Sequence, residues 1–236
     1  MAMVIGVFAG GGEAEVEGLI KFLKRNFPQK NFERYLPIRK KKPKPNKQTR
    51  GYGHTNESLI VQIQETLIQA IDNNPNFCES ILILDDLDCR NVQTQRSNFL
   101  QSIANIDECR EIDVFVGFAS PEIEAWIVAD WDNSIARHPD FRRRHNRMRH
   151  WLSTQRNVNF RKPESFSEYD PQKDCCSEKL SKALIESTQF LEDRKKNFPI
   201  YSKGSHTPDL LLMVEAEIIQ QRCPEFRQMY NHLNRE

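Results

Sequence analysis

Residues 80–88 read SerIleLeuIleLeuAspAspLeuAsp, and this stretch decides the fold expected for the chain. A short, continuous apolar run is typical of a strand buried on both faces, as in a parallel sheet. A similar run at 4–8 leads into three glycines at 10–12 and then into apolar residues at helical spacing over 16–23. Strand, turn and helix in this order predict an α/β fold, Rossmann-like, with a mostly parallel sheet flanked by helices.

Further elements extend this pattern along the chain. The apolar spacing predicts helices over 58–71 and 93–106 and a third strand over 112–118. Ser120-Pro121-Glu122 is typical of a helix start, with a capping serine and a proline in the first turn. The last helices are expected over 176–190 and 209–221, as helical and loop C-terminal additions to the core.

Changes in composition predict two domains. Residues 1–135 are expected to form the α/β core, with a basic loop inserted at 34–56, where prolines and like charges oppose a helix. Residues 136–236 are expected to form a basic, mostly helical extension that packs on the core.

The composition excludes some protein classes. No apolar run approaches the roughly 20 residues of a membrane helix, and the first residues lack the pattern of a secretory signal, so no membrane association and a cytoplasmic location are expected. The 34 Lys and Arg residues nearly balance the 33 Asp and Glu, but basic and acidic residues cluster separately. The six cysteines form no CxxC pair and are interpreted as reduced thiols.

Acidic residues follow each predicted strand. Glu13 follows the first, Asp86 and Asp88 the second, and Glu122 and Glu124 the third. Loops at the carboxyl ends of parallel strands converge on one crevice, and carboxylates gathered there favour Mg²⁺ or Mn²⁺. Asp86 and Asp88 would point to the same side of an extended segment. Each acid taken singly is also explained as a helix cap, a first-turn acid or a solvated residue.

The glycine turn at 10–12 leaves a separate possibility open. A glycine turn before a helix can bind phosphate, but this one matches neither GxxxxGK[ST] nor GxGxxG. A nucleotide-binding regulator is therefore a minor alternative.

Four segments together resemble the TOPRIM family, and most closely the small TOPRIM-like proteins near RloB and the OLD-family nucleases. They are AlaGlyGlyGlyGlu (9–13), IleLeuAspAspLeuAsp (83–88), SerProGluIleGluAlaTrp (120–126) and TyrSerLys (201–203). The resemblance implies a TOPRIM-like fold and metal-dependent phosphodiester chemistry. It also implies a role in phage defence, in some relatives beside an ABC-type ATPase partner.

The same resemblance implies roles for individual residues. Asp86 and Asp88 match the paired aspartates that bind Mg²⁺, Glu124 the glutamate before the tryptophan, and Glu13 the second acid of the glycine turn. Lys203 matches a late lysine that stabilises the transition state. The first acid of the turn, a metal ligand or general base in relatives, is replaced here by Ala9, so weakened or absent catalysis is an open alternative.

Two basic segments are candidate nucleic-acid contacts. Arginines in 142–150 are interleaved with His and followed by Trp151, a pattern that suits phosphate neutralisation and base stacking. A solvated surface is the alternative interpretation. The candidate residues are Lys40, Lys41, Lys42, Arg142, Arg143, Arg144, Arg147 and Arg149.

The sequence thus favours a Mg²⁺-dependent, TOPRIM-like nuclease acting on DNA or RNA. The alternative is a weakly active or inactive nucleic-acid-binding subunit of a multiprotein defence or repair complex. The choice between DNA and RNA and the oligomeric state are left open.

Overall fold

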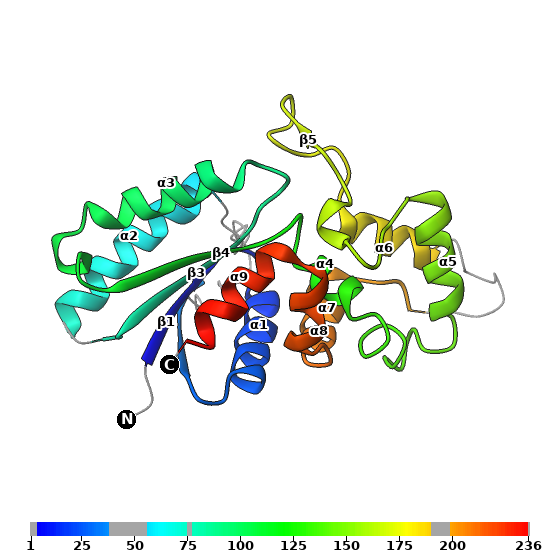
Figure 1. Cartoon of the computed structure of the whole chain (residues 1–236), viewed down its shortest axis with the longest axis horizontal. Helices are drawn as coiled ribbons and strands as arrows, with labels where there is room; N and C mark the ends of the chain where they lie inside the picture. Colours follow the sequence, from blue (N-terminus) through cyan, green and yellow to red (C-terminus); the bar gives the residue numbers. More distant parts are fainter. Residues whose placement is uncertain (1–3, 38–55, 75–76, 190–198, 236) are drawn as a thin grey trace, which may run out of the picture. The chain divides into compact units, whose positions relative to one another are not determined.

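The computed structural model of the chain describes residues 4–37, 56–74, 77–189 and 199–235 (Figure 1). The chain divides into two compact units. The first contains Met1–Asp85 and Val92–Gly117, and the second contains Asp86–Asn91 and Phe118–Glu236. The polypeptide therefore passes between the units three times.

The first unit is built on a sheet of four parallel strands in the order β2-β1-β3-β4. The central strand β1 pairs Ile5 with Phe32 of β2 on one side and with Ser80 of β3 on the other. Burial runs through β3 without alternation, as expected where helices cover both faces. The predicted α/β fold with a parallel sheet is confirmed. The strands are β1 (Val4–Ala9), β2 (Asn31–Leu36), β3 (Ser80–Asp86) and β4 (Asp113–Ala119).

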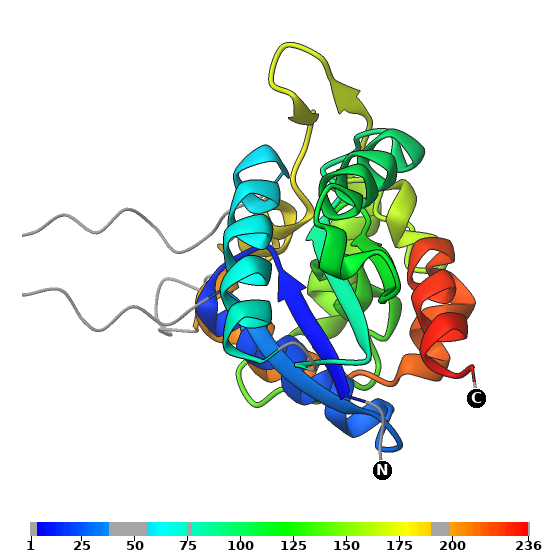
Figure 2. The ribbon, with the colours of Figure 1, turned by 90° about the vertical axis from the view of Figure 1, so that its left-hand side faces the viewer.

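Helices cover this sheet because parallel strands need crossover connections. Right-handed crossovers require α1 (Glu13–Asn26) on one face, and α2 (Asn56–Asn73) and α3 (Val92–Ala104) on the other. Figures 1 and 2 show α2 and α3 side by side, in agreement with this rule. A short 3₁₀ helix, η1 (Asp107–Cys109), precedes β4.

The predicted basic loop at 34–56 is wrong at its start, because residues 34–36 belong to β2. Tyr35 lies within this strand, and its ring stacks on Phe8 of β1 at 5.3 Å between centroids. Aromatic packing of this kind stabilises the strand, although its charged residues obscure the pattern of apolar residues from which a strand is predicted. The rest of the loop, from residue 38 to 55, lies outside the described residues.

The glycine turn ends β1 beside β3. The backbone N–H of Gly10 donates to the carbonyl of Leu84 at 2.8 Å, and Gly11 has φ of 94°. This left-handed backbone favours glycine, which explains the turn without a bound phosphate. Ala9, at the end of β1, is buried.

The second unit is mostly helical. Trp126 packs edge-on against Phe226 at 4.8 Å, and Trp131 packs against Phe160 at 5.1 Å. Both tryptophans are fully buried and belong to the core of this unit. The helices are α4 (Glu124–Ala129), α5 (His145–Gln155), η2 (Pro163–Ser165), α6 (Leu180–Gln189), α7 (Lys203–Leu211), α8 (Ala216–Arg222) and α9 (Pro224–Leu233).

The boundary between the units differs from the predicted domain boundary at 135/136. Residues 118–135 belong to the second unit because α4 packs on α7 and α8. The helix expected from Ser120 begins only at Glu124. The helix expected over 209–221 is two helices, because Glu215 is extended and donates its N–H to Asp130 at 2.8 Å. No helix among the described residues has both the length and the apolar character needed to cross a membrane.

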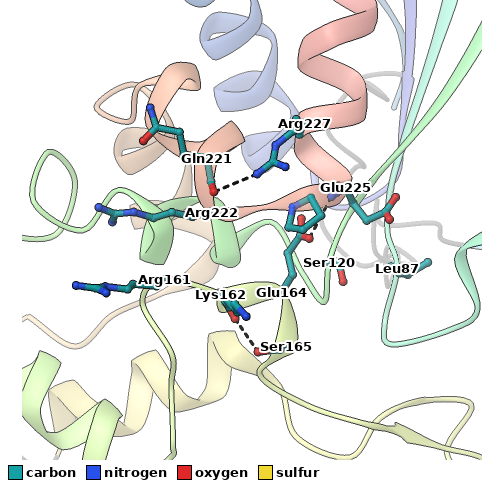
Figure 3. Close-up of a pocket in the computed structure, with 11 residues that line it drawn as sticks. Leu87, Ser120, Arg161, Lys162, Glu164, Ser165, Gln221, Arg222, Glu225 and Arg227 are labelled. Atoms are coloured by element: carbon teal, nitrogen blue, oxygen red, sulfur yellow. Dashed lines mark hydrogen bonds between the residues drawn. The ribbon is translucent and has the colours of Figure 1, made fainter.

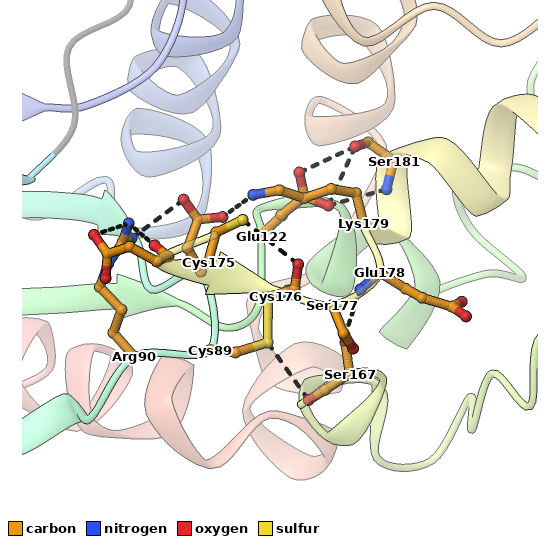
Figure 4. Close-up of a disulfide and its surroundings, with 12 residues drawn as sticks. Cys89, Arg90, Glu122, Ser167, Cys175, Cys176, Ser177, Glu178, Lys179 and Ser181 are labelled. Carbon is orange, nitrogen blue, oxygen red and sulfur yellow. Dashed lines mark hydrogen bonds and ion pairs between the residues drawn. A yellow bond between two sulfur atoms is a disulfide. The ribbon is translucent and has the colours of Figure 1, made fainter. Parts of the chain in front are cut away.

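The prediction that all cysteines are free thiols is wrong. Cys89, in the loop after β3, forms a disulfide with Cys176, 87 residues later (Figure 4). Cys176 lies in a two-stranded antiparallel hairpin of β5 (Tyr169–Asp170) and β6 (Cys175–Cys176). Cysteine spacing gives no indication of a pair this distant in sequence. The remaining cysteines, Cys78, Cys109, Cys175 and Cys223, are free.

Candidate active site

Three carboxylates of the second unit surround the side-chain amine of Lys203. Nζ lies 3.2 Å from Oδ2 of Asp86, 3.6 Å from Oε1 of Glu122 and 3.3 Å from Oε2 of Glu124. The side chain of Lys203 is 31% exposed, whereas those of Glu122 and Glu124 are 5% and 0% exposed. The four residues, called the Lys203 cluster below, therefore form a largely buried ionic site with access to solvent at the lysine.

Backbone hydrogen bonds bring the acidic segments together. The loop after β3 is joined to the segment after β4, where Leu87 N–H donates to Ala119 and Asp88 N–H donates to Pro121, each at 2.9 Å. The N–H of Ile123 donates to Oδ1 of Asp86 at 2.9 Å. These bonds explain why acids that follow different strands meet.

Neutral donors fix the orientation of the two glutamates. The N–H and hydroxyl of Ser181 donate to the carboxylate of Glu122 at 3.0–3.2 Å. The hydroxyls of Tyr201 and Thr207 donate to Oε1 of Glu124 at 3.1 and 2.9 Å. Because these donors bear no charge, they do not neutralise the glutamates. The cation beside them, Lys203, compensates their negative charge.

Burial makes the hydroxyl of Tyr201 a stable neutral donor. Burial, together with the adjacent Glu124, raises the pKa of Tyr201 well above its ordinary value near 10. The phenol therefore keeps its proton and its hydrogen bond to Glu124 throughout the physiological pH range.

Asp88 does not belong to the Lys203 cluster. Its carboxylate binds Lys179 and lies 3.4 Å from Nη1 of Arg90. The expected extended geometry is wrong, because β3 ends at Asp86 and Asp88 has φ of 52°. Burial opposes the charged form of Lys179, but Asp88 outweighs burial and leaves the lysine pKa raised. The two aspartates thus face different cations.

Glu13 lies in the other unit. It begins α1, and its side chain lies outside the part of the chain that the structure describes. Its predicted metal role stays a prediction.

The donor set of the Lys203 cluster suits a hard divalent cation. Three carboxylates lie around the ammonium of Lys203, and carboxylate oxygens oriented by further hydrogen bonds are typical ligands of Mg²⁺ and Mn²⁺. Among the described residues, no group of three His, Cys, Asp or Glu side chains has the spacing of a ready metal site. The ammonium of Lys203 lies between the carboxylates, which explains that spacing.

The basic segment 142–150 is divided between surface and core. Arg142, Arg143 and Arg147 are exposed, as a nucleic-acid contact requires. Arg149 is partly buried, pairs with Asp132 at 3.2 Å and lies over the ring of Phe160. Arg144 is 5% exposed and donates to the carbonyl of Pro199, so it is a core residue and not a surface contact. Lys40, Lys41 and Lys42 lie outside the described residues.

Sequence reasoning missed part of this site. Glu122 was grouped with Glu124 but not assigned a role, although its position two residues earlier was a usable signal. Tyr201 lies in the TyrSerLys segment, yet its contact with Glu124 depends on the tertiary fold. Ser181 and Lys179 carry no motif that could have identified them.

Comparison with known proteins gives no relative for this chain. No protein-family model, no curated protein and no solved structure matches it.

Proposed function

We propose that the chain is a metal-dependent nuclease that hydrolyses phosphodiester bonds of DNA or RNA. The observation that carries the proposal is the convergence of Asp86, Glu122 and Glu124 on Lys203. A site with several oriented carboxylates and one lysine suits a reaction in which both a cation and an anionic phosphate are bound. The resemblance of four sequence segments to TOPRIM proteins supports the same chemistry.

Each residue of the Lys203 cluster would have a different role in the reaction. Asp86, Glu122 and Glu124 would hold Mg²⁺ or Mn²⁺, which supplies Lewis acidity and a more acidic bound water. Tyr201 and Thr207 would keep Glu124 oriented. Lys203, the most exposed of the four, would contribute positive charge beside a phosphoryl oxygen as negative charge develops.

The exposed arginines would bring the substrate to this site. Arg142, Arg143 and Arg147 present positive charge to solvent in the same unit as the Lys203 cluster. Such residues bind the phosphate backbone without reading its sequence and make binding sensitive to salt.

A nuclease assay tests the proposal. Purified protein is incubated with single- and double-stranded DNA and RNA in Mg²⁺, Mn²⁺ or EDTA. Asp86→Asn and Glu122→Gln are expected to reduce metal-dependent cleavage by at least about a hundredfold. Asp107→Asn, which changes an exposed pair with Arg110, is the matched control. Cleavage that persists in EDTA or in both site variants contradicts the proposal.

A weakly active or inactive nucleic-acid-binding subunit of a multiprotein defence or repair complex is the second candidate. The observation that favours it is Ala9, which stands where the resemblance places an acid and is buried at the end of β1. Salt-sensitive binding of nucleic acid without cleavage in any metal would support this function instead.

A further inference from the structure

A separate cavity of about 500 Å³ lies in the second unit (Figure 3). Its volume falls within the roughly 300–1,000 Å³ of small-molecule pockets. The wall combines the segment after β3, the segment after β4, η2 and the junction of α8 and α9. Leu87 and Ser120 contribute from the first two segments, so the cavity adjoins the loops that carry Asp86 and Glu122.

Four cationic side chains line this cavity: Arg161, Lys162, Arg222 and Arg227. Arg227 donates to the carbonyls of Gln220 and Gln221 at 2.7 and 3.1 Å, and Arg222 donates to the carbonyl of Ala129. Within the described part of the chain, none of the four forms an ion pair with a carboxylate. Figure 3 shows Arg161 and Arg222 pointing in the same direction.

Two carboxylates, those of Glu164 and Glu225, also line the cavity, against the four cationic side chains. Glu164 accepts the N–H groups of Glu225 and Phe226 at 3.1 and 3.4 Å, which caps the start of α9. Burial, together with the nearby Glu225, raises the pKa of Glu164 to about 7, although those two N–H bonds and Arg227 oppose the rise. Glu164 is therefore partly protonated at neutral pH, and the cavity has an excess of positive charge.

We propose that this cavity binds a phosphate-bearing ligand of mononucleotide size. Arginine and lysine side chains recognise phosphate oxygens, and the apolar Leu87 and Pro224 offer surface to the remainder of such a ligand. The phosphate comes either from a free nucleotide or from the phosphorylated end of a nucleic-acid strand. In the second case the cavity would anchor the substrate of the proposed nuclease.

Binding is measured by calorimetry in EDTA, where metal-dependent cleavage does not occur. The probes are adenosine 5′-monophosphate, adenosine, inorganic phosphate, and one DNA oligonucleotide with a 5′-phosphate or a 5′-hydroxyl. At least one phosphorylated probe should bind about tenfold or more tightly than its unphosphorylated counterpart. Preference for the monophosphate indicates a free nucleotide, and preference for the phosphorylated oligonucleotide indicates a strand end.

Two double variants test whether the measured binding occurs in this cavity. The double variant Arg161→Gln, Lys162→Gln removes two exposed cations, and we expect about a tenfold loss of affinity or more. The matched control is Arg110→Gln, Lys182→Gln, because both residues are exposed and lie outside the cavity. Melting curves verify that both double variants fold.

Three results overturn the proposal. They are equal affinity for phosphorylated and unphosphorylated probes, unchanged affinity in the Arg161, Lys162 variant, and no binding of any probe. The Asp86→Asn variant separates this inference from the nuclease proposal, because it should lose cleavage and retain phosphate binding. Failure of the nuclease assay alone therefore leaves the binding result standing.

Discussion

The side-chain amine of Lys203 lies 3.3 Å from Oε2 of Glu124, a carboxylate whose side chain is 0% exposed. A buried carboxylate is stable as an ion only where a cation and hydrogen bonds compensate its lost hydration. Tyr201 and Thr207 supply the hydrogen bonds, and Lys203 supplies positive charge. The chain therefore contains its own counterion at the place where a divalent cation is proposed to bind.

Replacing Lys203 by methionine should make the protein more responsive to Mg²⁺. Loss of the ammonium leaves three carboxylates facing one another, which should lower the free energy of unfolding by about 3 kcal/mol in EDTA. Added Mg²⁺ should then raise the melting temperature of Lys203→Met more than that of the wild type. The measurement is thermal unfolding at constant ionic strength. An equal shift in both proteins, or a larger one in the exposed-site control Lys182→Met, argues against a cation site at this position.

Tyr201→Phe should destabilise the protein, because Glu124 loses a donor in a buried site. The expected cost is about 1–3 kcal/mol in the free energy of unfolding, measured by denaturant titration. Because the folded-state pKa of Tyr201 is raised, its contribution is present below pH 10 and is lost as the pH rises through the folded-state value. Absorbance of phenolate should show a tyrosine that titrates well above pH 10 in the folded wild type and that is missing from folded Tyr201→Phe. Titration of every tyrosine near pH 10 in the folded state would contradict this assignment.

Removing the disulfide should lower stability. Cys89→Ser opens a link across 87 residues, and the expected loss is about 2–4 kcal/mol in the free energy of unfolding. Cys175→Ser is a close control, since Cys175 adjoins Cys176 but is free. The reductant dithiothreitol should reproduce the effect of Cys89→Ser in the wild type and have no effect on the variant. A wild type that is insensitive to reductant would show that the pair does not form.

Glu164→Gln should remove a pH dependence of stability. The folded-state pKa of Glu164 is raised from 4.5 to about 7, so its favourable contribution is complete below pH 4.5 and is lost as the pH rises through 7. The wild type should therefore lose up to about 3 kcal/mol across this window relative to Glu164→Gln, which cannot ionise. Denaturant titrations at pH 4.5, 6 and 8 measure the difference. Parallel pH profiles for the two proteins would exclude a raised pKa.

Arg143 and Arg144 are neighbours with opposite expected phenotypes. Arg143 is exposed, so Arg143→Gln should weaken nucleic-acid binding and its salt dependence while changing stability by less than about 0.5 kcal/mol. Arg144 is buried and donates to the carbonyl of Pro199, so Arg144→Gln should lower the melting temperature. Anisotropy of a labelled oligonucleotide and thermal unfolding measure the two effects. The reverse pattern would mean that the exposed arginine is structural.

The central sheet could be predicted because its strands carry a strong local signal. Residues 81–84 are continuously apolar, and the acids that follow mark the end of the strand. The edge strand β2 is not evident from the sequence, because its two adjacent charged residues, Glu33 and Arg34, interrupt the apolar ones next to a basic segment. The aromatic contact between Tyr35 and Phe8 that stabilises it is visible only in three dimensions.

The candidate site was predictable in its acids but not in its partners. Asp86, Glu124 and Lys203 share one cluster, as their motifs suggested, whereas the residues that orient them lie in segments without motifs. The expectation for Asp88 rests on its spacing from Asp86 and on the resemblance, but a backbone φ of 52° directs the chain elsewhere. Spacing predicts side-chain direction only within a regular strand, and β3 ends at Asp86, before Asp88.

The chain leaves the first unit for only six residues, Asp86–Asn91, before returning to it at α3. That excursion contains Asp86 of the Lys203 cluster and Cys89 of the disulfide. No single cut in the polypeptide can therefore separate the units and keep the cluster whole. A single cleavage or truncation would therefore divide the residues of the Lys203 cluster as well as the fold. Recombination with another protein would have to exchange both units together.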